Sequence, residues 1–228
     1  MRAVTAIVAA AGRGTRLGAE LPKAFVELGG ITLLERSVAA LEASGVVDDT
    51  IVVVSPDMED TARRVLAGRG VSFVHGGAER ADSMYNGLRA IDAEDGVVLI
   101  HDAARCLTPP GMIARVAGAV VGGEVAAVPV VAVADTIKEV DAAGAVVVST
   151  PSRARLRAVQ TPQAFDLREL RRANEAYFSE RPEFVATDDA SLMEWFGARV
   201  ATVEGDALAF KITTPLDMRL AQALIHVR

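Results

Sequence analysis

Short runs of apolar residues, each bounded by turn residues, recur along the first 133 positions of the chain. A run that is apolar throughout is typical of a strand buried on both faces of a sheet, and β-branched residues favour strand over helix. The pattern therefore predicts five buried strands, at residues 3–9, 50–54, 71–74, 97–100 and 125–133.

Segments with helical spacing of apolar residues separate these runs. The clearest spans residues 32–43, where Thr32 and Glu35 have the spacing of a capping box. Leu34 and Val38 then begin an apolar stripe along one face of that helix. Further helices are predicted at residues 57–67, 81–93, 110–121, 166–177 and 189–196. Strands that alternate with helices predict an α/β fold, a Rossmann-like three-layer sandwich with a mainly parallel sheet between the helices.

After the fifth strand the pattern changes to two strand-like runs, residues 136–140 and 145–149, joined by the turn Asp-Ala-Ala-Gly. This spacing predicts a β-hairpin. The stretch that follows, 150–157, holds three arginines and little that could be buried. We therefore expect residues 135–157 to project from the body as a β-arm, and such an arm often meets another subunit.

The chain then returns to the body. A strand is predicted at residues 199–203, and a last helix would be capped by Thr214 and opened by Pro215. No internal repeat, low-complexity tract or linker interrupts the pattern. We therefore expect residues 1–228 to form a single domain that carries the arm.

Composition and charge exclude several classes of protein. With 51% hydrophobic and 24% charged residues, the chain has the makeup of a soluble globular protein. Its 24 Lys and Arg against 30 Asp and Glu give a net charge of -6, which argues against a nonspecific nucleic-acid binder. The longest apolar run is only about half of the roughly 20 residues that a membrane span needs, so no membrane partner is expected.

The single cysteine, Cys106, excludes an intrachain disulfide framework and a thiolate zinc site. It fits a reducing compartment, so we expect a cytoplasmic protein. The first residues, with one cation before an apolar run, also have features of a short signal peptide. Cleavage there would remove the first predicted strand, so we expect that segment to belong to the fold.

In an open parallel sheet, ligands bind at the carboxyl ends of the strands, so the loops after the strands form the candidate site. The first loop holds Ala10, Ala11 and Gly12, followed by Arg16 and Lys23. Its glycines let backbone N–H groups approach an anion, and its cations suit a polyphosphate. A dinucleotide fingerprint does not fit, because the third glycine stands one place late, and a Walker A loop is absent. Two interpretations of this loop stay open. It binds a nucleoside triphosphate that loses pyrophosphate, or it is a plain glycine-rich turn whose arginines are solvated.

The loops after the third and fourth strands carry further polar groups. Gly77 precedes a helix that holds Asp82 and Ser83. The glycine offers amide donors to a phosphate or a base, whereas the two polar residues also have the positions of ordinary helix caps. Asp102 follows the fourth strand, where one carboxylate plus phosphate oxygens would suit Mg²⁺. Its neighbour His101 lacks metal-ligand spacing, so we assign it a packing or hydrogen-bonding role.

These motifs, taken in order with those further along the chain, resemble one family. They read Ala-Ala-Gly-x-Gly-x-Arg with a following Pro-Lys, Gly-Gly-x-Glu-Arg-x-Asp-Ser, His-Asp-Ala-Ala-Arg, Thr-Pro-Gln, Thr-Asp-Asp and Lys-Ile-Thr. The order resembles the 2-C-methyl-D-erythritol 4-phosphate cytidylyltransferases over nearly the whole chain. The resemblance implies transfer of CMP from CTP to methylerythritol phosphate, with release of pyrophosphate, in non-mevalonate isoprenoid biosynthesis. It also implies a nucleotidyltransferase domain and a homodimer joined through the arm.

The resemblance also implies roles for individual residues. The nucleotide would be held by Ala10, Ala11, Gly12, Gly77, Arg80 and Ser83. The catalytic cations would be Arg16, Lys23, Arg153 and Lys211. The acceptor would be bound by Asp102, Arg105, Thr161 and Thr187, and Asp102 would also hold Mg²⁺ or another hard divalent cation. Arg153 and Thr161 fall where the family's arm reaches into the neighbouring subunit's site, so each site of a homodimer would borrow them.

Three positions depart from the family pattern: Cys106, Arg157 and Ala209 stand where the family commonly has Pro, Trp and Asn. The departures concern the surroundings of the acceptor. A cytidylyltransferase for another polyol phosphate, such as ribitol 5-phosphate, therefore stays an alternative. More distant alternatives are an NAD-dependent reductase and a noncatalytic nucleotide-binding protein.

Charge also determines the expected mechanism. A phosphate monoester has a second pKa of about 6, so the attacking oxygen of the acceptor is already largely deprotonated at neutral pH. No general base is then needed. We expect instead that Arg16, Lys23, Lys211 and Mg²⁺ offset the repulsion between two polyanions in the in-line transition state.

Overall fold

The structure is a computed structural model, and it describes residues 2–12, 14, 17–18 and 21–226. Its main sheet has eight strands: β1 (Val4–Ala9), β4 (Asp49–Val54), β5 (Val71–His75), β6 (Val97–Asp102), β7 (Ala126–Ala132), β10 (Arg157–Val159), β11 (Gln163–Asp166) and β12 (Val200–Glu204). β1 pairs in parallel with β4 and β6, β4 with β5, and β7 with β12. β10 and β11 are the antiparallel members, both against β7, and β11 also pairs with β6.

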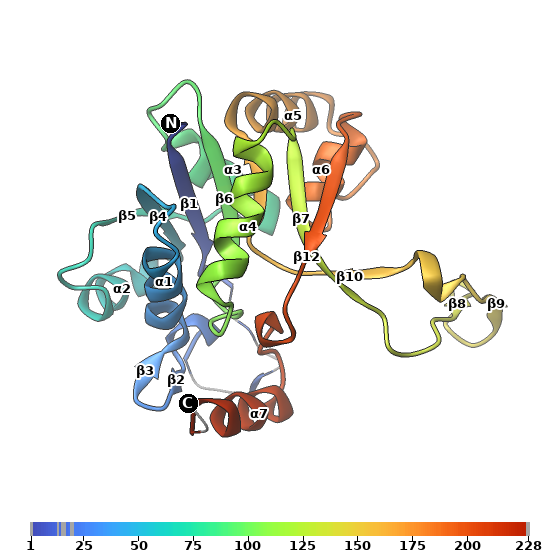
Figure 1. The fold of residues 1–228 in the computed structure, drawn as a ribbon, viewed down its shortest axis with the longest axis horizontal. Coiled ribbons are helices and arrows are strands. Elements are labelled where there is room, and N and C mark those ends of the chain that lie inside the picture. The colour runs from blue at the N-terminus through green and yellow to red at the C-terminus, as the bar shows by residue number, and fades with distance from the viewer. Residues whose placement is uncertain (1, 13, 15–16, 19–20, 227–228) are drawn as a thin grey trace.

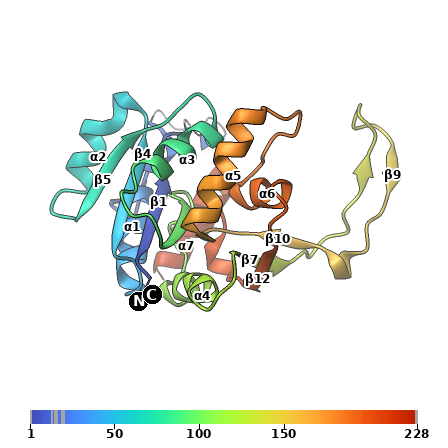
Figure 2. The same cartoon turned by 90° about the horizontal axis from the view of Figure 1, so that it is seen from above.

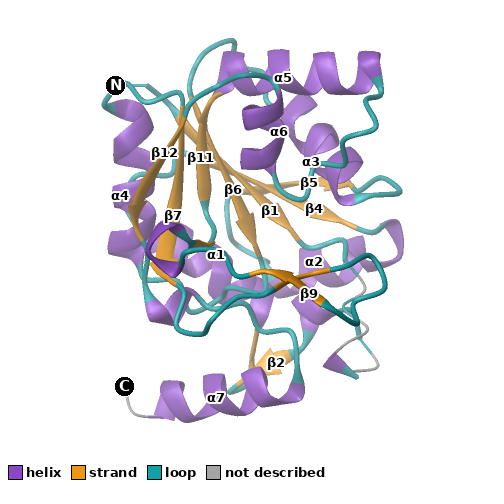
Figure 3. Ribbon diagram, turned by 90° about the vertical axis from the view of Figure 1, so that its right-hand side faces the viewer, coloured by secondary structure: helices purple, strands orange, loops and turns teal. Residues whose placement is uncertain are grey.

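Helices cover both faces of this sheet (Figures 1 and 3). One face packs against α1 (Leu33–Ala43), α2 (Glu59–Val65) and α4 (Pro110–Val121), and the other against α3 (Arg80–Arg89), α5 (Leu167–Glu180) and α6 (Asp189–Trp195). Alternate residues of β1 point to the two sides, so that Ala6 and Val8 join the first core and Ile7 joins the second. The predicted three-layer α/β fold is confirmed.

The best-defined helix of the sequence pattern, α1, forms for the predicted reasons. The Thr32 hydroxyl accepts a hydrogen bond from the Glu35 amide at 3.1 Å, and the Glu35 carboxylate accepts one from the Thr32 amide at 3.0 Å. Leu34, Val38 and Leu41 are fully buried against the sheet. Both the capping box and the apolar stripe are therefore confirmed.

A smaller unit lies at the far end of the body from α5, seen at the bottom of Figure 1. It contains the ribbon β2 (Glu27–Leu28) and β3 (Ile31–Thr32), with α7 (Pro215–His226) packed beside β2. Leu28, Leu33, Ile212 and Cys106 form its buried cluster. Burial raises the pKa of the Cys106 thiol to about 12, which agrees with a structural role for this residue.

The segment between β7 and β10 projects from the body (Figures 1 and 2). It carries the two-stranded ribbon β8 (Glu139–Val140) and β9 (Val147–Ser149), so the predicted hairpin is confirmed, with shorter strands. The second strand starts later than predicted because the Asp141 carboxylate accepts hydrogen bonds from the amides of Ala145 and Val146 at 2.8 and 3.2 Å. These bonds draw residues expected in the second strand into the turn.

Other boundaries also differ from the sequence-based prediction. The second helix was predicted at 57–67, but a 3₁₀ turn at Pro56–Met58 precedes α2, which is therefore shorter. The third begins at Arg80 because Glu79 and Asp82 form a capping box there, and it ends at Arg89. Strands β10 and β11 were not predicted at all. No helix within the described part of the chain is long and apolar enough to cross a bilayer.

Candidate active site

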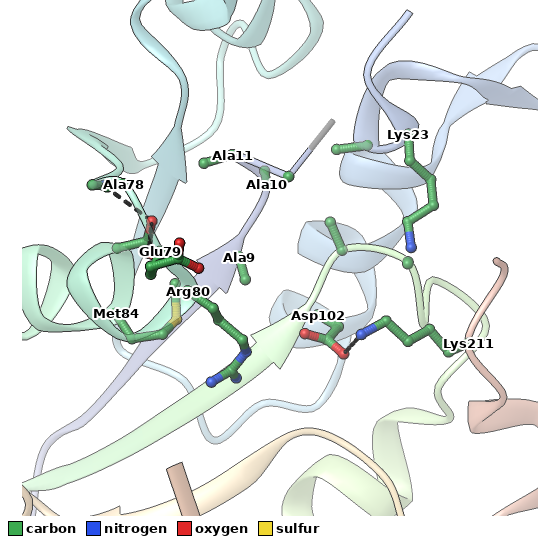
Figure 4. Close-up of a pocket in the computed structure, with 16 residues that line it drawn as sticks. Ala9, Ala10, Ala11, Lys23, Ala78, Glu79, Arg80, Met84, Asp102 and Lys211 are labelled. Carbon is green, nitrogen blue, oxygen red and sulfur yellow. Dashed lines mark hydrogen bonds and ion pairs between the residues drawn. The ribbon is translucent and has the colours of Figure 1, made fainter. Parts of the chain in front are cut away.

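A cavity of about 280 Å³ lies at the carboxyl ends of β1 and β6 (Figure 4). Its volume is near the lower end of the range for ligand pockets, roughly 300–1,000 Å³. Ala9 and Asp102, the last residues of these parallel strands, are paired in the sheet, so the loops that follow them start side by side. The sequence-predicted residues that line the cavity are Ala10, Ala11, Gly12, Lys23, Gly77, Arg80, Ser83, Asp102 and Lys211.

Lys23 is held at this cavity by its local structure. It opens a 3₁₀ turn, Lys23–Phe25, whose next two side chains are buried. Gly14, at a φ of 62°, lies close behind it: a Cβ built on Gly14 would stand 2.5 Å from the Cβ of Lys23. Only glycine is free of strain at that position, so the loop can close against Lys23. Arg16, predicted to act with Lys23, lies outside the described residues.

The second glycine loop is fixed by Ser83. Its hydroxyl accepts a hydrogen bond from the Gly77 amide at 3.0 Å and donates one to the carbonyl oxygen of Glu79 at 3.0 Å. A Cβ on Gly76 would stand 2.8 Å from the Cβ of Ala11, so the two glycine loops lie against each other. The helix-cap interpretation holds for Asp82, whose carboxylate accepts from the Glu79 amide at 2.9 Å, whereas Ser83 holds the loop.

The Asp102 carboxylate lies among several cationic side chains of the site. Lys211 Nζ lies 2.8 Å from its Oδ2, and Arg105 Nε lies 3.7 Å from the same atom. Burial alone would raise the pKa of Asp102, but the positive charges of Lys211, Arg80 and Arg105 hold that pKa at about 2. The carboxylate is therefore fully charged at neutral pH. Figure 4 shows the ammonium groups of Lys23 and Lys211 on the side of the cavity where Asp102 ends β6.

Arg105 supports this centre from within the protein. Its Nη1 donates a hydrogen bond to the carbonyl oxygen of Ala209 at 2.7 Å, and 14% of its side chain is exposed. Burial lowers the pKa of Arg105. It does not line the cavity, so its predicted contact with the acceptor stays a prediction.

Thr161 lies beneath Asp102 in the same subunit. Its hydroxyl accepts a hydrogen bond from the Asp102 amide and lies 3.0 Å from His101 Nδ1. Thr161 is 6% exposed and its hydroxyl is engaged within its own chain, and its predicted place in a neighbouring subunit's site stays a prediction. His101 is fully buried, and burial lowers its pKa to about 4. Its assigned hydrogen-bonding role agrees with this geometry.

Two further predicted residues lie outside the cavity. Thr187 is exposed in the loop before α6, and its amide donates a hydrogen bond to the Ser191 hydroxyl at 3.0 Å. Arg153 is on the arm, where its Nη1 donates a hydrogen bond to the carbonyl oxygen of Ala134 at 2.5 Å. Their roles in acceptor binding and in a partner's site stay predictions.

Asp189 was assigned no role in the sequence-based prediction, and the structure places it next to the site. Its Oδ2 lies 2.7 Å from Arg80 Nη2, and the residue is 4% exposed. The contact joins α3 to α6, more than 100 positions apart, so no local spacing could reveal it. Two signals in the sequence point to Asp189: it is the last residue of the Thr-Asp-Asp motif, and Asp188 alone suffices to cap the helix, which leaves its acidic neighbour unexplained.

A mainly parallel α/β sheet whose strand ends carry glycine loops and convergent lysines fits one class, the nucleotidyltransferases that act on phosphorylated acceptors. The chain matches the family model of 2-C-methyl-D-erythritol 4-phosphate cytidylyltransferase (IspD) over residues 4–227. It therefore belongs to the 2-C-methyl-D-erythritol 4-phosphate cytidylyltransferase family, and the predicted enzyme class is confirmed.

Individual relatives agree with this family. The 2-C-methyl-D-erythritol 4-phosphate cytidylyltransferase of Corynebacterium efficiens is 60% identical over 97% of this chain and 92% of its own length. That of Corynebacterium diphtheriae is 60% identical over 98% of this chain and 93% of its own. High identity over nearly the full length supports the predicted activity in isoprenoid biosynthesis.

Solved structures agree as well. The 4-diphosphocytidyl-2C-methyl-D-erythritol synthase of Anaerococcus prevotii superposes with a TM-score of 0.86 at 30% identity, covering 99% of both chains. The 2-C-methyl-D-erythritol 4-phosphate cytidylyltransferase of Thermus thermophilus gives a TM-score of 0.82 at 38% identity, covering 98% of this chain and 99% of the other. The NAD-dependent reductase alternative is thereby set aside.

Proposed function

We propose that this chain transfers CMP from CTP to the phosphate of 2-C-methyl-D-erythritol 4-phosphate, giving 4-diphosphocytidyl-2-C-methyl-D-erythritol and pyrophosphate. One observation carries the proposal: Lys23, Lys211 and Arg80 converge on a single cavity whose other lining residues are mostly glycine and alanine, with Glu79 and Asp102 as the acidic ones. The chain as a whole has a net charge of -6. A local gathering of cations on an acidic protein is what two polyanionic reactants need in order to meet.

The nucleotide would bind where the two glycine loops touch. Ala10, Ala11, Gly12 and Gly77 carry small or no side chains, so backbone amides can approach a phosphate or a base. Ser83 keeps the second loop in place through its hydrogen bond from the Gly77 amide. The resemblance assigns CTP to these same residues.

The acceptor would react directly at the α-phosphorus. Its deprotonated phosphate oxygen forms the new P–O bond, the bond from the α-phosphorus to the bridging oxygen breaks, and pyrophosphate leaves with that electron pair. Lys23 and Lys211 supply the positive charge that this transition state needs. This direct displacement uses no general base and no nucleophile of the protein. The two candidates for such roles are His101, which is buried with a pKa of about 4, and Cys106, whose pKa is about 12. Neither is suited to act as base or nucleophile at neutral pH.

Asp102 fits a hard divalent cation such as Mg²⁺. It lines the cavity, and its pKa of about 2 keeps it charged. Among the residues that the structure describes, there is no group of three or more His, Cys, Asp or Glu side chains that could hold a metal ion. Substrate phosphates would therefore complete the coordination, which is how Mg²⁺ usually binds. When bound there, Mg²⁺ would neutralise charge on the triphosphate.

A homodimer joined through the arm is part of the proposal. The arm exposes Val146, Val147 and Val148, each to more than half of its surface. Exposed apolar residues grouped on a projecting ribbon favour burial against another subunit. Arg153, on the same arm, would then reach the partner's cavity. A cytoplasmic location is proposed from the single, unpaired cysteine.

Pyrophosphate release tests the function. CTP, UTP, ATP and GTP are each combined with methylerythritol phosphate and with ribitol 5-phosphate in the presence of Mg²⁺. We expect the highest kcat/KM for CTP with methylerythritol phosphate. A higher value with ribitol 5-phosphate would favour the alternative acceptor, and no release with either acceptor would contradict a transferase.

A further inference from the structure

Asp189 is a buried carboxyl group that the proposed mechanism does not use; burial raises its pKa, and the Arg80 guanidinium opposes that rise. Its side chain is 5% exposed, and the Arg80 guanidinium is 2.7 Å from its carboxylate. Burying a carboxylate away from water costs free energy unless the carboxylate is paired with an opposite charge. Removing one partner of a buried pair leaves the other charge uncompensated. Such a pair beside a cavity therefore fixes the position of both of its members.

The carboxylate side of this pair is rigidly anchored. The Gln163 side chain of β11 donates a hydrogen bond to the Asp188 carboxylate at 2.7 Å and accepts one from the Ala190 amide at 3.1 Å. The Asp188 carboxylate also accepts from the Ser191 amide at 2.8 Å, which caps α6. The first turn of α6 is thus tied to the sheet on both sides of Asp189. The position of Asp189 is therefore set by the start of α6, and its carboxylate in turn holds the longer Arg80 side chain in place.

Arg80 stands between two acidic groups. It lines the cavity, where Figure 4 shows its guanidinium reaching toward the side on which Asp102 lies. Its charge also acts on Asp102, although Asp102 has Lys211 as its close partner at 2.8 Å. The third nearby carboxylate, Asp188, is already engaged by Gln163 and Ser191. Without the charge of Asp189, the guanidinium would be drawn to Asp102 and would compete there with Lys211.

We infer that Asp189 is a positioning residue for the transfer reaction: it holds the Arg80 guanidinium against α6, so that Asp102 stays paired with Lys211. Asp189 acts through Arg80 and makes no contact with either reactant. The inference rests on the proposed function, because both reactants would occupy this cavity.

A double-mutant cycle on kcat/KM for CMP transfer tests this role. The four forms are the wild type, Asp189→Asn, Arg80→Gln and the double variant. Asp189→Asn is expected to lower kcat/KM at least about tenfold, since a group displaced by about 1 Å near the reacting atoms can cost up to 10²-fold. Combined with Arg80→Gln, the same change is expected to cost less than about twofold, because residues that act through one contact are strongly non-additive.

An equal loss in both backgrounds would overturn the inference, because Asp189 would then act independently of Arg80. Absence of transfer by the wild type would instead overturn the proposed function, and the inference with it. Thermal unfolding of each variant checks that it folds. Should Asp189→Asn not fold, Asp189→Glu keeps the charge but moves the carboxylate by one methylene, and the same cycle applies with the same two outcomes.

Asp166→Asn is a matched control. Asp166 also forms an ion pair, with Arg2 at 2.5 Å, and it also lies at a helix start. It is placed at the opposite end of β6 from Asp102, because it pairs there with Val97. The control is expected to lower the unfolding temperature and to leave kcat/KM unchanged. A loss of kcat/KM equal to that of Asp189→Asn would show a general effect of breaking an ion pair and would contradict the inference.

Discussion

Lys211 Nζ lies 2.8 Å from Asp102 Oδ2, although the two residues are more than 100 positions apart. A backbone hydrogen bond holds the two segments together, from the Ile212 amide to the carbonyl oxygen of Ala104 at 2.9 Å. The ammonium group is therefore placed at the cavity by both its backbone and its ion pair. Its position depends on Asp102 remaining charged.

Asp102→Asn keeps the shape of the side chain and removes its charge. Because Lys211 then loses its ion-pair partner, we expect kcat to fall on the order of 10²-fold, the typical cost of losing one preorganised donor to the transition state. Because the pKa of Asp102 is about 2, the wild-type residue does not titrate near neutral pH. The acidic limb of kcat/KM should therefore follow the acceptor phosphate, with a midpoint at about pH 6, in both the wild type and the variant. A midpoint that moves in the variant would assign that limb to Asp102 instead.

Lys23→Ala removes the cation beside the first glycine loop. We expect kcat to fall by roughly 10²- to 10³-fold, with an unchanged fold, since the lysine stabilises charge that develops in the transition state. Steady-state pyrophosphate release measures the loss. Arg64→Ala removes an exposed cation of α2 and serves as the control, with expected turnover like that of the wild type. Near-normal turnover of Lys23→Ala would remove Lys23 from the mechanism.

His101 links pH to stability. Burial holds its pKa at about 4, below the ordinary value of 6.5, so the unfolded chain binds more protons between these two values. The stabilisation is complete above pH 6.5 and is lost as the pH falls toward 4. His101→Gln should remove this dependence, which amounts to about 3 kcal/mol of unfolding free energy over that window.

Denaturant unfolding at a series of pH values measures the effect. Equal slopes for the wild type and His101→Gln would show that His101 is not held neutral.

The arm is expected to hold two subunits together. Val148, 64% exposed on β9, should lie in the interface, and Val148→Asp would place a charge there. We expect sedimentation to give a dimer for the wild type and a 23.9 kDa monomer for this variant. Leu216→Asp changes an apolar residue of α7 that is 73% exposed, and it should leave the dimer intact. A wild-type monomer with full activity would rule out sites shared between subunits.

The buried strands and α1 could be predicted because their signals are local. Continuous apolar runs gave β1 and β6, and the spacing of Thr32 and Glu35 gave the start of α1. Strands β10 and β11 could not be found in this way. They have three and four residues, and they become strands by pairing with β7 and β6, which are distant in the sequence.

The site was predictable to a similar extent. Residues at strand ends, such as Ala10 and Asp102, follow from the rule that parallel strands end at one edge of a sheet. Lys211 was assigned from resemblance alone, because no spacing connects it with β6. Thr161 and Asp189 needed the structure, since burial and a partner on another element define what each of them does.

The central claim is that the cations of the cavity bring two anions together for one direct displacement, without a covalent intermediate on the protein. The stereochemistry at the α-phosphorus tests it most directly. CTP carrying a chiral sulfur-substituted α-phosphate is reacted with methylerythritol phosphate, and the configuration of the product is determined by ³¹P NMR. A single in-line displacement predicts inversion at phosphorus. Retention would require two displacements, with a nucleotidyl group carried by a side chain, and would contradict the account.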